Sequence, residues 1–141
     1  MSKRIYVLNG PNLNLLGQRE PEIYGTTTLA DIERMVEDRA SAHGLKISFH
    51  QSNHEGDLID KMQEVGFTFD GIILNAGGYT HTSIALADCV SAITTPVVEV
   101  HISNIKEREV FRHHSYLEAV CVKSIMGEGL KGYELGLQHF L

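Results

Sequence analysis

The sequence predicts an α/β fold in which a parallel sheet of five strands is covered by helices on both faces. Two observations lead to this prediction. Short apolar runs alternate with amphipathic stretches along all 141 residues. Most of these runs are apolar throughout, as is typical of strands buried on both faces. Right-handed crossovers and the size of the chain then favour the flavodoxin-like doubly wound order 2-1-3-4-5, a three-layer sandwich in one domain covering 1–141.

The first predicted strand, residues 5–8, is followed by a sharp break and a long connection at residues 13–27. This connection has no clear helical or strand period, and loops of that length are usually functional or disordered. Because it carries Arg19, Glu20 and Tyr24, one interpretation is a lid over a site. A mobile surface loop with incidental charges is the alternative, and this stretch alone does not separate the two.

The next helix is predicted at 28–43, because Thr28 and Asp31 have the spacing of a capping box and Gly44 stands where a helix stops. The later helix that ends near 93 is apolar nearly all round, with Asp88 as its only charge, so we expect it to be buried. The other elements are predicted as a strand at 45–50, a helix at 55–65, strands at 71–74 and 97–100, a helical turn at 107–112, a strand at 119–126 and a closing helix at 129–141.

Composition excludes several classes of partner. The formal net charge is −6 and no basic block stands out, which argues against nucleic acid and anionic membranes. No apolar run approaches the roughly 20 residues that span a bilayer, and the start of the chain lacks the apolar stretch of a signal peptide.

Cys89 and Cys121 form no CxxC motif, so we expect reduced core thiols in a cytoplasmic protein. Eight histidines make a metal site worth testing.

In such sheets a ligand binds beyond the carboxyl ends of the strands. The predicted strand ends and the turns after them supply amides, imidazoles and a carboxylate: Asn9, Asn12, His50, Gln51, Asn53, Asn75, Gly77, Gly78, Glu99 and His101. Asparagines after the first strand argue against the acidic cluster of a response regulator and against a flavin-phosphate loop. The GxGxxG, GxxxxGK[ST] and GxSxG motifs are absent from the sequence.

Two groups are candidates for acid–base chemistry. Glu99 and His101 stand two apart on a strand and so share a face. They could orient an acid or begin a metal site, although no third ligand is evident, or they could form a core pair. Tyr24 could act as a base only if its pKa fell by roughly 3 units, about 4 kcal/mol, and Arg19 could supply the cation. Packing of Tyr24 on the fold is the alternative.

Five motifs resemble those of the type II 3-dehydroquinate dehydratases, and the resemblance covers nearly the whole chain. They are NGPNLNLLGQREPEIYG at 9–25, QSNHEG at 51–56, NAGGYTHTS at 75–83, EVHISN at 99–104 and FRHHS at 111–115. The resemblance implies anti elimination of water from 3-dehydroquinate, through an enolate, to give 3-dehydroshikimate. It also implies that no metal or cofactor takes part. The same reaction serves the shikimate pathway of aromatic biosynthesis and the breakdown of quinate.

The resemblance also implies roles for particular residues. Tyr24 would remove the proton next to the ketone, and Arg19 would lower the pKa of Tyr24 and stabilise negative charge. Asn12 would place a water that stabilises the enolate. His101, oriented by Glu99, would protonate the departing hydroxyl.

For substrate binding, the resemblance assigns the carboxylate to the backbone amides of Ile102 and Ser103 and to Asn75. The ring hydroxyls go to His81 and Arg112, and Asp88 serves the site of a neighbouring subunit in a dodecamer of trimers. Arg108 resembles a further family arginine near the loop. Two other classes remain alternatives: a metal-dependent hydrolase that uses some of the histidines, and a non-catalytic sensor that binds a small acid on the same fold.

Overall fold

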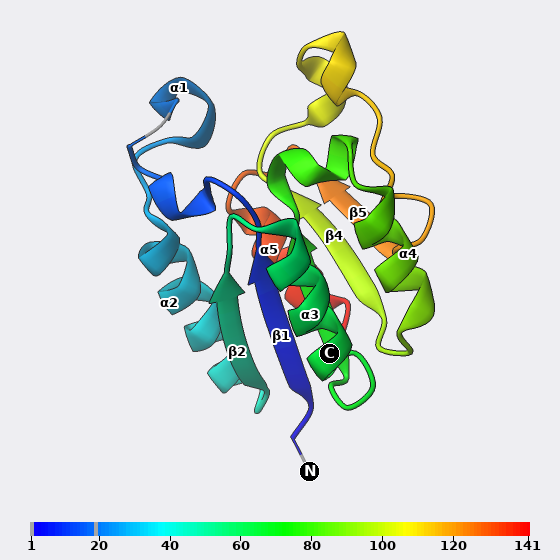
Figure 1. The fold of residues 1–141 in the computed structure, drawn as a ribbon. Coiled ribbons are helices and arrows are strands. Elements are labelled where there is room, and N and C mark those ends of the chain that lie inside the picture. Colours follow the sequence, from blue (N-terminus) through cyan, green and yellow to red (C-terminus); the bar gives the residue numbers. More distant parts are fainter. Residues whose placement is uncertain (1, 19) are drawn as a thin grey trace.

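Five parallel strands form a single sheet in the order β2-β1-β3-β4-β5, which confirms the predicted topology (Figure 1). The computed structural model describes residues 2–18 and 20–141, without the side chains of residues 23 and 24. The strands are β1 (Arg4–Asn9), β2 (Lys46–Gln51), β3 (Gly71–Asn75), β4 (Val97–His101) and β5 (Lys123–Met126). In the register of β1, Asn9 lies beside Gln51 of β2 and Asn75 of β3, so the polar strand ends are level.

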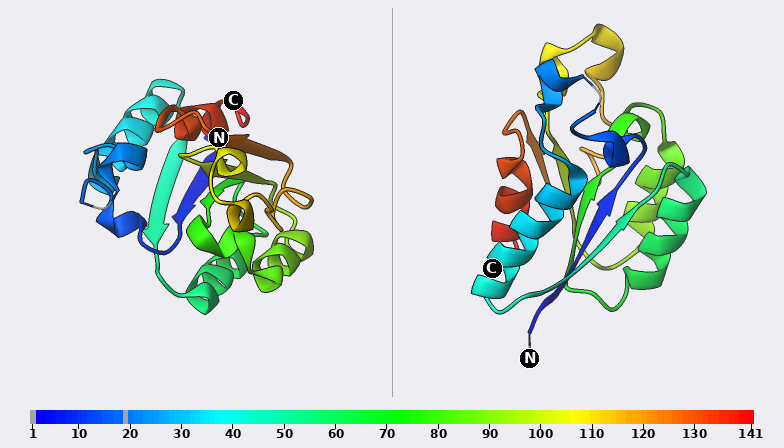
Figure 2. Two further views of the ribbon diagram at one scale, coloured as in Figure 1. Left: turned by 90° about the horizontal axis from the view of Figure 1, so that it is seen from above. Right: turned by 90° about the vertical axis from the view of Figure 1, so that its left-hand side faces the viewer.

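The helices form two layers, one on each face of the sheet (Figure 2). On one face α2 (Leu29–Ala42) packs beside α5 (Lys131–Gln138), and on the other α3 (Glu55–Val65) packs beside α4 (Ile84–Ala92). Alternate residues of each strand enter opposite cores, as the period of a strand requires. Ile73 of β3, for example, belongs to the core under α2 and α5, whereas its neighbours Ile72 and Leu74 belong to the core under α3 and α4.

Local signals set the helix ends. Thr28 and Asp31 form the predicted capping box, because each side chain accepts a hydrogen bond from the other's backbone N–H. Gly44 follows α2 at a φ of +70°, a conformation that glycine adopts without strain. Ser83 caps the start of α4, and its hydroxyl accepts from the amide of Leu86 at 2.9 Å.

Four predictions of local structure need correction. The long connection contains a 3₁₀ turn, η1 (Leu13–Leu15), and a short helix, α1 (Pro21–Tyr24). The turn after β3 is a 3₁₀ helix, η2 (Gly77–His81), and the helical turn expected at 107–112 is two 3₁₀ turns, η3 (Ile105–Glu107) and η4 (Val110–Arg112). The last strand begins four residues later than predicted, because the amides of Val120 and Cys121 both bond to the carbonyl of Leu117 and close a turn there.

Helix α4 is not buried on every side, so that prediction is wrong for the single chain. Ile84 is 57% exposed, and Ala85 and Asp88 are exposed with it. The residues of α4 that do face the sheet, such as Leu86 and Val90, are buried. The outer surface of α4 therefore combines apolar side chains with one carboxylate.

Both cysteines are free thiols, as predicted, and Cys89 is buried. Burial, together with the negative charge of Glu99, raises the pKa of Cys121 to about 12. Of the helices in residues 2–18 and 20–141, none has the length and apolar character needed to cross a membrane.

Candidate active site

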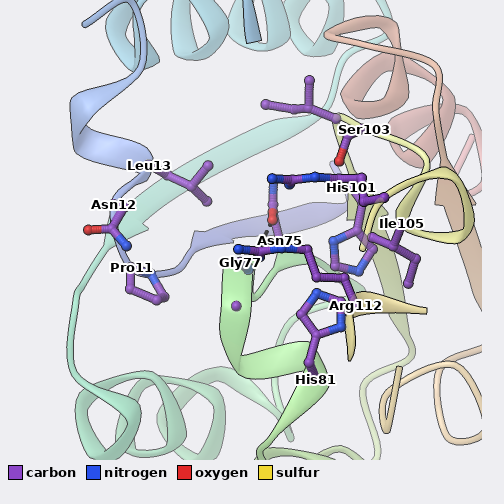
Figure 3. A pocket seen from close by; sticks show the side chains of 13 residues that line it. Pro11, Asn12, Leu13, Asn75, Gly77, His81, His101, Ser103, Ile105 and Arg112 are labelled. Carbon is purple, nitrogen blue, oxygen red and sulfur yellow. Dashed lines mark hydrogen bonds between the residues drawn. The ribbon is translucent and has the colours of Figure 1, made fainter. Parts of the chain in front are cut away.

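A cavity of about 240 Å³ lies at the carboxyl edge of the sheet, where β1, β3 and β4 end (Figure 3). Segments far apart in the sequence line it: Pro11, Asn12, Leu13, Asn75, Gly77, Gly78, His81, His101, Ile102, Ser103, Ile105, Arg108 and Arg112. Pro11, Asn12 and Leu13 lie on one side, and the two imidazoles lie on the other with Arg112. This volume and lining suit a small polar molecule.

Most of the residues predicted for the site meet at this cavity. Those that line it are Asn12, Asn75, His81, His101, Ile102, Ser103 and Arg112. Glu99 lies behind His101 and is fully buried. Asp88 is on the outer surface of α4 and does not line the cavity. Arg19 and the side chain of Tyr24 lie outside the described residues.

Residues at the end of β2 do not reach the cavity, although the sequence placed them near it. His50 pairs with Asp57 at 2.7 Å, and Gln51 donates to the carbonyl of Gly10 at 3.1 Å. Asn53 instead supports the cavity from outside, because its side-chain oxygen accepts from the backbone amide of Asn12 at 2.9 Å. Asn12 itself has a φ of +68°, an uncommon conformation that asparagine tolerates better than most residues.

Glu99 is the acceptor for a converging set of donors. His101 Nε2 lies 2.6 Å from Oε2 of Glu99. The same oxygen accepts from the hydroxyls of Thr80 at 2.5 Å and Ser115 at 2.6 Å, while Oε1 accepts from Ser124 at 2.6 Å. Burial alone would raise the pKa of Glu99, but the hydrogen bonds and the charge of His101 outweigh it and lower this pKa to about 2. The carboxylate is therefore ionised at neutral pH.

The contact with Glu99 determines which ring nitrogen of His101 is available to a ligand. An ionised carboxylate only accepts hydrogen bonds, so Nε2 carries a proton. Within residues 2–18 and 20–141, Nδ1 of His101 makes no hydrogen bond. Because His101 lines the cavity, Nδ1 is the atom left to exchange a proton with a bound molecule.

His81 is held in the neutral form with a defined tautomer. Its Nδ1 lies 2.9 Å from the carbonyl of His114, which can only accept, so Nδ1 carries the proton. Burial lowers the pKa of His81, and repulsion from His101, Arg112 and Arg108 lowers it further against the effect of the backbone bond. The neutral ring leaves Nε2 as a hydrogen-bond acceptor.

Two arginines make the cavity electropositive. Arg112 pairs with Glu109 at 2.5 Å, within one 3₁₀ turn of the chain. Arg108 has a side chain only 12% exposed and lies 3.9 Å from the carboxylate of Glu20, which directly precedes α1. Lining of this kind attracts an anionic ligand.

The segment after β4 is fixed by backbone bonds. The carbonyls of Ile102 and Ser103 accept from the amides of Gly129 and Gly127 at 3.1 and 3.2 Å. Gly127 has a φ of +77°, and a Cβ there would lie 2.9 Å from the Cβ of Asn104. This close approach holds the segment against the turn that follows β5.

Sequence reasoning missed the three hydroxyls around Glu99. Thr80 and Ser115 occur inside motifs that were recognised, NAGGYTHTS and FRHHS, but nothing in a single sequence indicates that they meet a carboxylate. Ile105, which lines the cavity, was also missed. In the described part of the chain, no three side chains of the His, Cys, Asp and Glu types gather as metal ligands.

Comparisons with known proteins give one result. The family model for dehydroquinase class II matches residues 3–141. A 3-dehydroquinate dehydratase of Dinoroseobacter shibae is 56% identical over 133 residues, 94% of this chain and 89% of that protein. One of Rhodopseudomonas palustris is 55% identical over 138 residues, 97% of this chain and 91% of that protein. The crystal structure of a type II dehydroquinase from Butyrivibrio crossotus superposes with a TM-score of 0.96 at 44% identity, covering 99% and 97% of the two chains.

Proposed function

This chain belongs to the dehydroquinase class II family, and we propose that it removes water from 3-dehydroquinate by anti elimination through an enolate, with His101 as the acid. The family and its relatives make the chain a hydro-lyase with 3-dehydroquinate dehydratase activity. The pair formed by His101 and Glu99 is the observation on which the assignment of the acid depends.

Hydroxide is a poor leaving group, so the carbon–oxygen bond breaks readily only if the oxygen receives a proton. Protonated His101 gives up the proton on Nδ1 to the departing hydroxyl, while Nε2–H stays bonded to Glu99. The negative charge of Glu99 attracts the positive ring, and the surrounding hydroxyls keep the carboxylate from taking the proton itself. Water and the conjugated enone are the products.

We assign the base to Tyr24, with Arg19 as the cation that lowers its pKa and stabilises the enolate. Both assignments rest on the motif at 9–25. A tyrosinate is strong enough to remove a proton next to a ketone, but it forms at neutral pH only beside positive charge. Asn12, across the cavity from His101, is assigned to a water that stabilises the enolate oxygen. Residues 13–27 are assigned to the lid.

The substrate carboxylate is assigned to the backbone amides of Ile102 and Ser103 and to the side chain of Asn75. Backbone amides suit an anion, because they neutralise it without a flexible side chain. His81 accepts from one ring hydroxyl through Nε2, and Arg112 donates to another. The electropositive lining favours an acid over a neutral sugar-like molecule.

Asp88 is assigned to the site of a neighbouring subunit in a dodecamer built from trimers. The exposed face of α4, where Ile84 lies beside Asp88, supports a contact with a second copy. Native mass spectrometry measures the assembly directly. Asp88→Asn should then weaken substrate binding while the mass of the assembly stays the same.

The reaction is tested by incubating the protein with 3-dehydroquinate and following the absorbance of the conjugated enone. We expect turnover that survives exhaustive dialysis against a chelator. In the cell, the same reaction should serve either aromatic biosynthesis or quinate breakdown. Tyr24→Phe should lose nearly all kcat while it still binds substrate. A folded wild-type protein without turnover would overturn the proposal, and a Tyr24→Phe variant at the wild-type rate would remove Tyr24 as the base.

A further inference from the structure

The hydroxyl of Tyr133 joins the ends of two strands beneath the cavity. Tyr133 comes from α5 and is completely buried. Its oxygen lies 2.6 Å from Oδ1 of Asn9, the last residue of β1, and 3.0 Å from Nδ2 of Asn75, the last residue of β3. Burial raises the pKa of Tyr133, so the group is a neutral phenol with one proton to donate.

The donor and the acceptor can be assigned for each of the three hydrogen bonds that link Gly77, Asn75, Tyr133 and Asn9. The backbone N–H of Gly77 donates to the side chain of Asn75 at 3.1 Å, so the atom that it meets is the oxygen, Oδ1. The other end of the amide, Nδ2, then faces Tyr133, whose oxygen must accept. The one phenol proton is therefore donated to Asn9.

This arrangement determines what Asn75 presents to a ligand. Its oxygen is used by Gly77, and one of the two protons on Nδ2 is used by Tyr133. Asn75 lines the cavity, so the second N–H is the polar group that its side chain retains for a bound molecule. If the amide were reversed, Asn75 would present an acceptor and would repel a carboxylate.

We propose that Tyr133 is a positioning residue, which holds the amide of Asn75 with an N–H toward an oxygen of the bound substrate. The inference rests on the proposed function, in which that oxygen belongs to the substrate carboxylate. Tyr133 does not line the cavity and acts only through Asn75. By orienting Asn75, Tyr133 contributes to the specificity of the site for a substrate that carries a carboxylate.

A purely structural role would predict a different local arrangement. Nδ2 of Asn9 is buried without a hydrogen-bond partner, and it is the only such side-chain atom found among the described residues. A buried donor without a partner is destabilising. The network thus fixes the orientation of the Asn75 amide at both ends and leaves Asn9 incomplete, which is the pattern expected when a functional group is given priority over stability.

Tyr133→Phe removes the hydroxyl and keeps the ring. We expect KM for 3-dehydroquinate to rise about 5- to 20-fold with little change in kcat, because a carboxylate contact is equally strong in the ground and transition states. Thr95 is buried just before β4, at the amino end of the sheet, and its hydroxyl donates to the backbone carbonyl of Phe69 at 2.8 Å. Thr95→Val, which also removes a buried hydroxyl, is therefore the matched control. It should lower the melting temperature and leave KM unchanged.

A double-mutant cycle shows whether Tyr133 acts through Asn75. In an Asn75→Ala background, Tyr133→Phe should add nothing to KM, whereas independent effects would add. If Tyr133→Phe does not fold, Asn9→Ala takes its place: without the acceptor the phenol is released, and KM should rise in the same direction. The inference would be overturned if Tyr133→Phe kept the wild-type KM, or if the effects of the two substitutions on KM were fully additive.

Calorimetry separates this result from a failure of the proposed function. His101→Ala should bind 3-dehydroquinate without turning it over, and adding Tyr133→Phe should weaken that binding by the same 5- to 20-fold. No turnover by the wild type would overturn the reaction. Turnover by the wild type together with an unchanged Kd in the double variant would overturn only the role of Tyr133.

Discussion

His101 Nε2 lies 2.6 Å from an oxygen of Glu99, and this carboxylate is fully buried behind the ring. A buried charge is costly unless it is paired and hydrogen-bonded, and Glu99 meets that condition through His101 and three hydroxyls. Since Glu99 does not line the cavity, any effect it has on the reaction passes through His101. Glu99 and His101 should therefore behave as one functional unit.

Replacing Glu99 by glutamine should lower kcat about 10- to 100-fold with little change in KM. The amide keeps the shape of the side chain but removes the negative charge that lies against His101 Nε2. Steady-state kinetics measures both constants. In a His101→Ala background the same change should cost nothing further, because there is no ring left to act on. A Glu99→Gln variant with wild-type kcat would contradict the assignment of His101 as a charged acid.

The low pKa of Glu99 also predicts how stability depends on pH. Its folded pKa of about 2 lies below the ordinary value of 4.5, so the stabilisation is fully present above pH 4.5. It is lost as pH falls from 4.5 toward 2, at a cost on the order of 3 kcal/mol. Urea midpoints measured between pH 7 and 3 should fall more steeply for the wild type than for Glu99→Gln, which has no carboxyl to titrate at this position. Parallel curves would count against the prediction.

The neutral state of His81 predicts a pH effect on substrate binding. Its pKa is lowered from 6.5, so the ring accepts a hydrogen bond at neutral pH and loses this ability when it gains a proton. We therefore expect KM to rise as pH falls from 7 to about 5. His81→Gln cannot be protonated in this range, so its KM should be higher at pH 7 but flatter with pH. If the variant shows the same rise as the wild type, another group is responsible.

The order of strands and layers could be predicted because the apolar runs have strand length and strand character. The local errors have a common cause, which is that hydrogen bonds between residues close in sequence form short turns that the apolar pattern does not reveal. Val120 and Cys121 look like strand residues, yet their amides close a turn on Leu117, and their side chains pack against the core under α3 and α4. The exposure of Ile84 was missed because an apolar helix usually indicates burial within its own chain.

Within the site, a spacing of two residues was enough to place Glu99 and His101 on one face of a strand. The residues that support them could not be predicted in the same way. Tyr133 lies 124 positions from Asn9, and no periodicity connects the two. Thr80 reaches Glu99 only because η2 turns back over the end of β4. Such contacts depend on the tertiary fold, so a single sequence does not contain a local signal for them.

Gly10 provides a test of how tightly the two sides of the cavity are joined. A Cβ at this position would lie 2.6 Å from the carbonyl oxygen of Ala76, a backbone atom that cannot rotate away. The amide of Gly10 also donates to the carbonyl of Asn75 at 2.7 Å. Gly10→Ala should therefore push apart the segments that follow β1 and β3, both of which line the cavity. We expect a loss of about 1–3 kcal/mol in the free energy of unfolding and a clear rise in KM.

Gly56→Ala is the matched control for Gly10→Ala. A Cβ at Gly56, in α3, would meet no atom within 4 Å. Alanine is favoured over glycine in a helix by up to about 1 kcal/mol, so this variant should be as stable as the wild type or more so. Its KM should not change. If Gly10→Ala loses stability but keeps the wild-type KM, the segments after β1 and β3 adjust without moving the ligand-binding groups. Asn12 and Asn75 would then be positioned independently, and the steric clash between the added Cβ and the Ala76 carbonyl would affect folding alone.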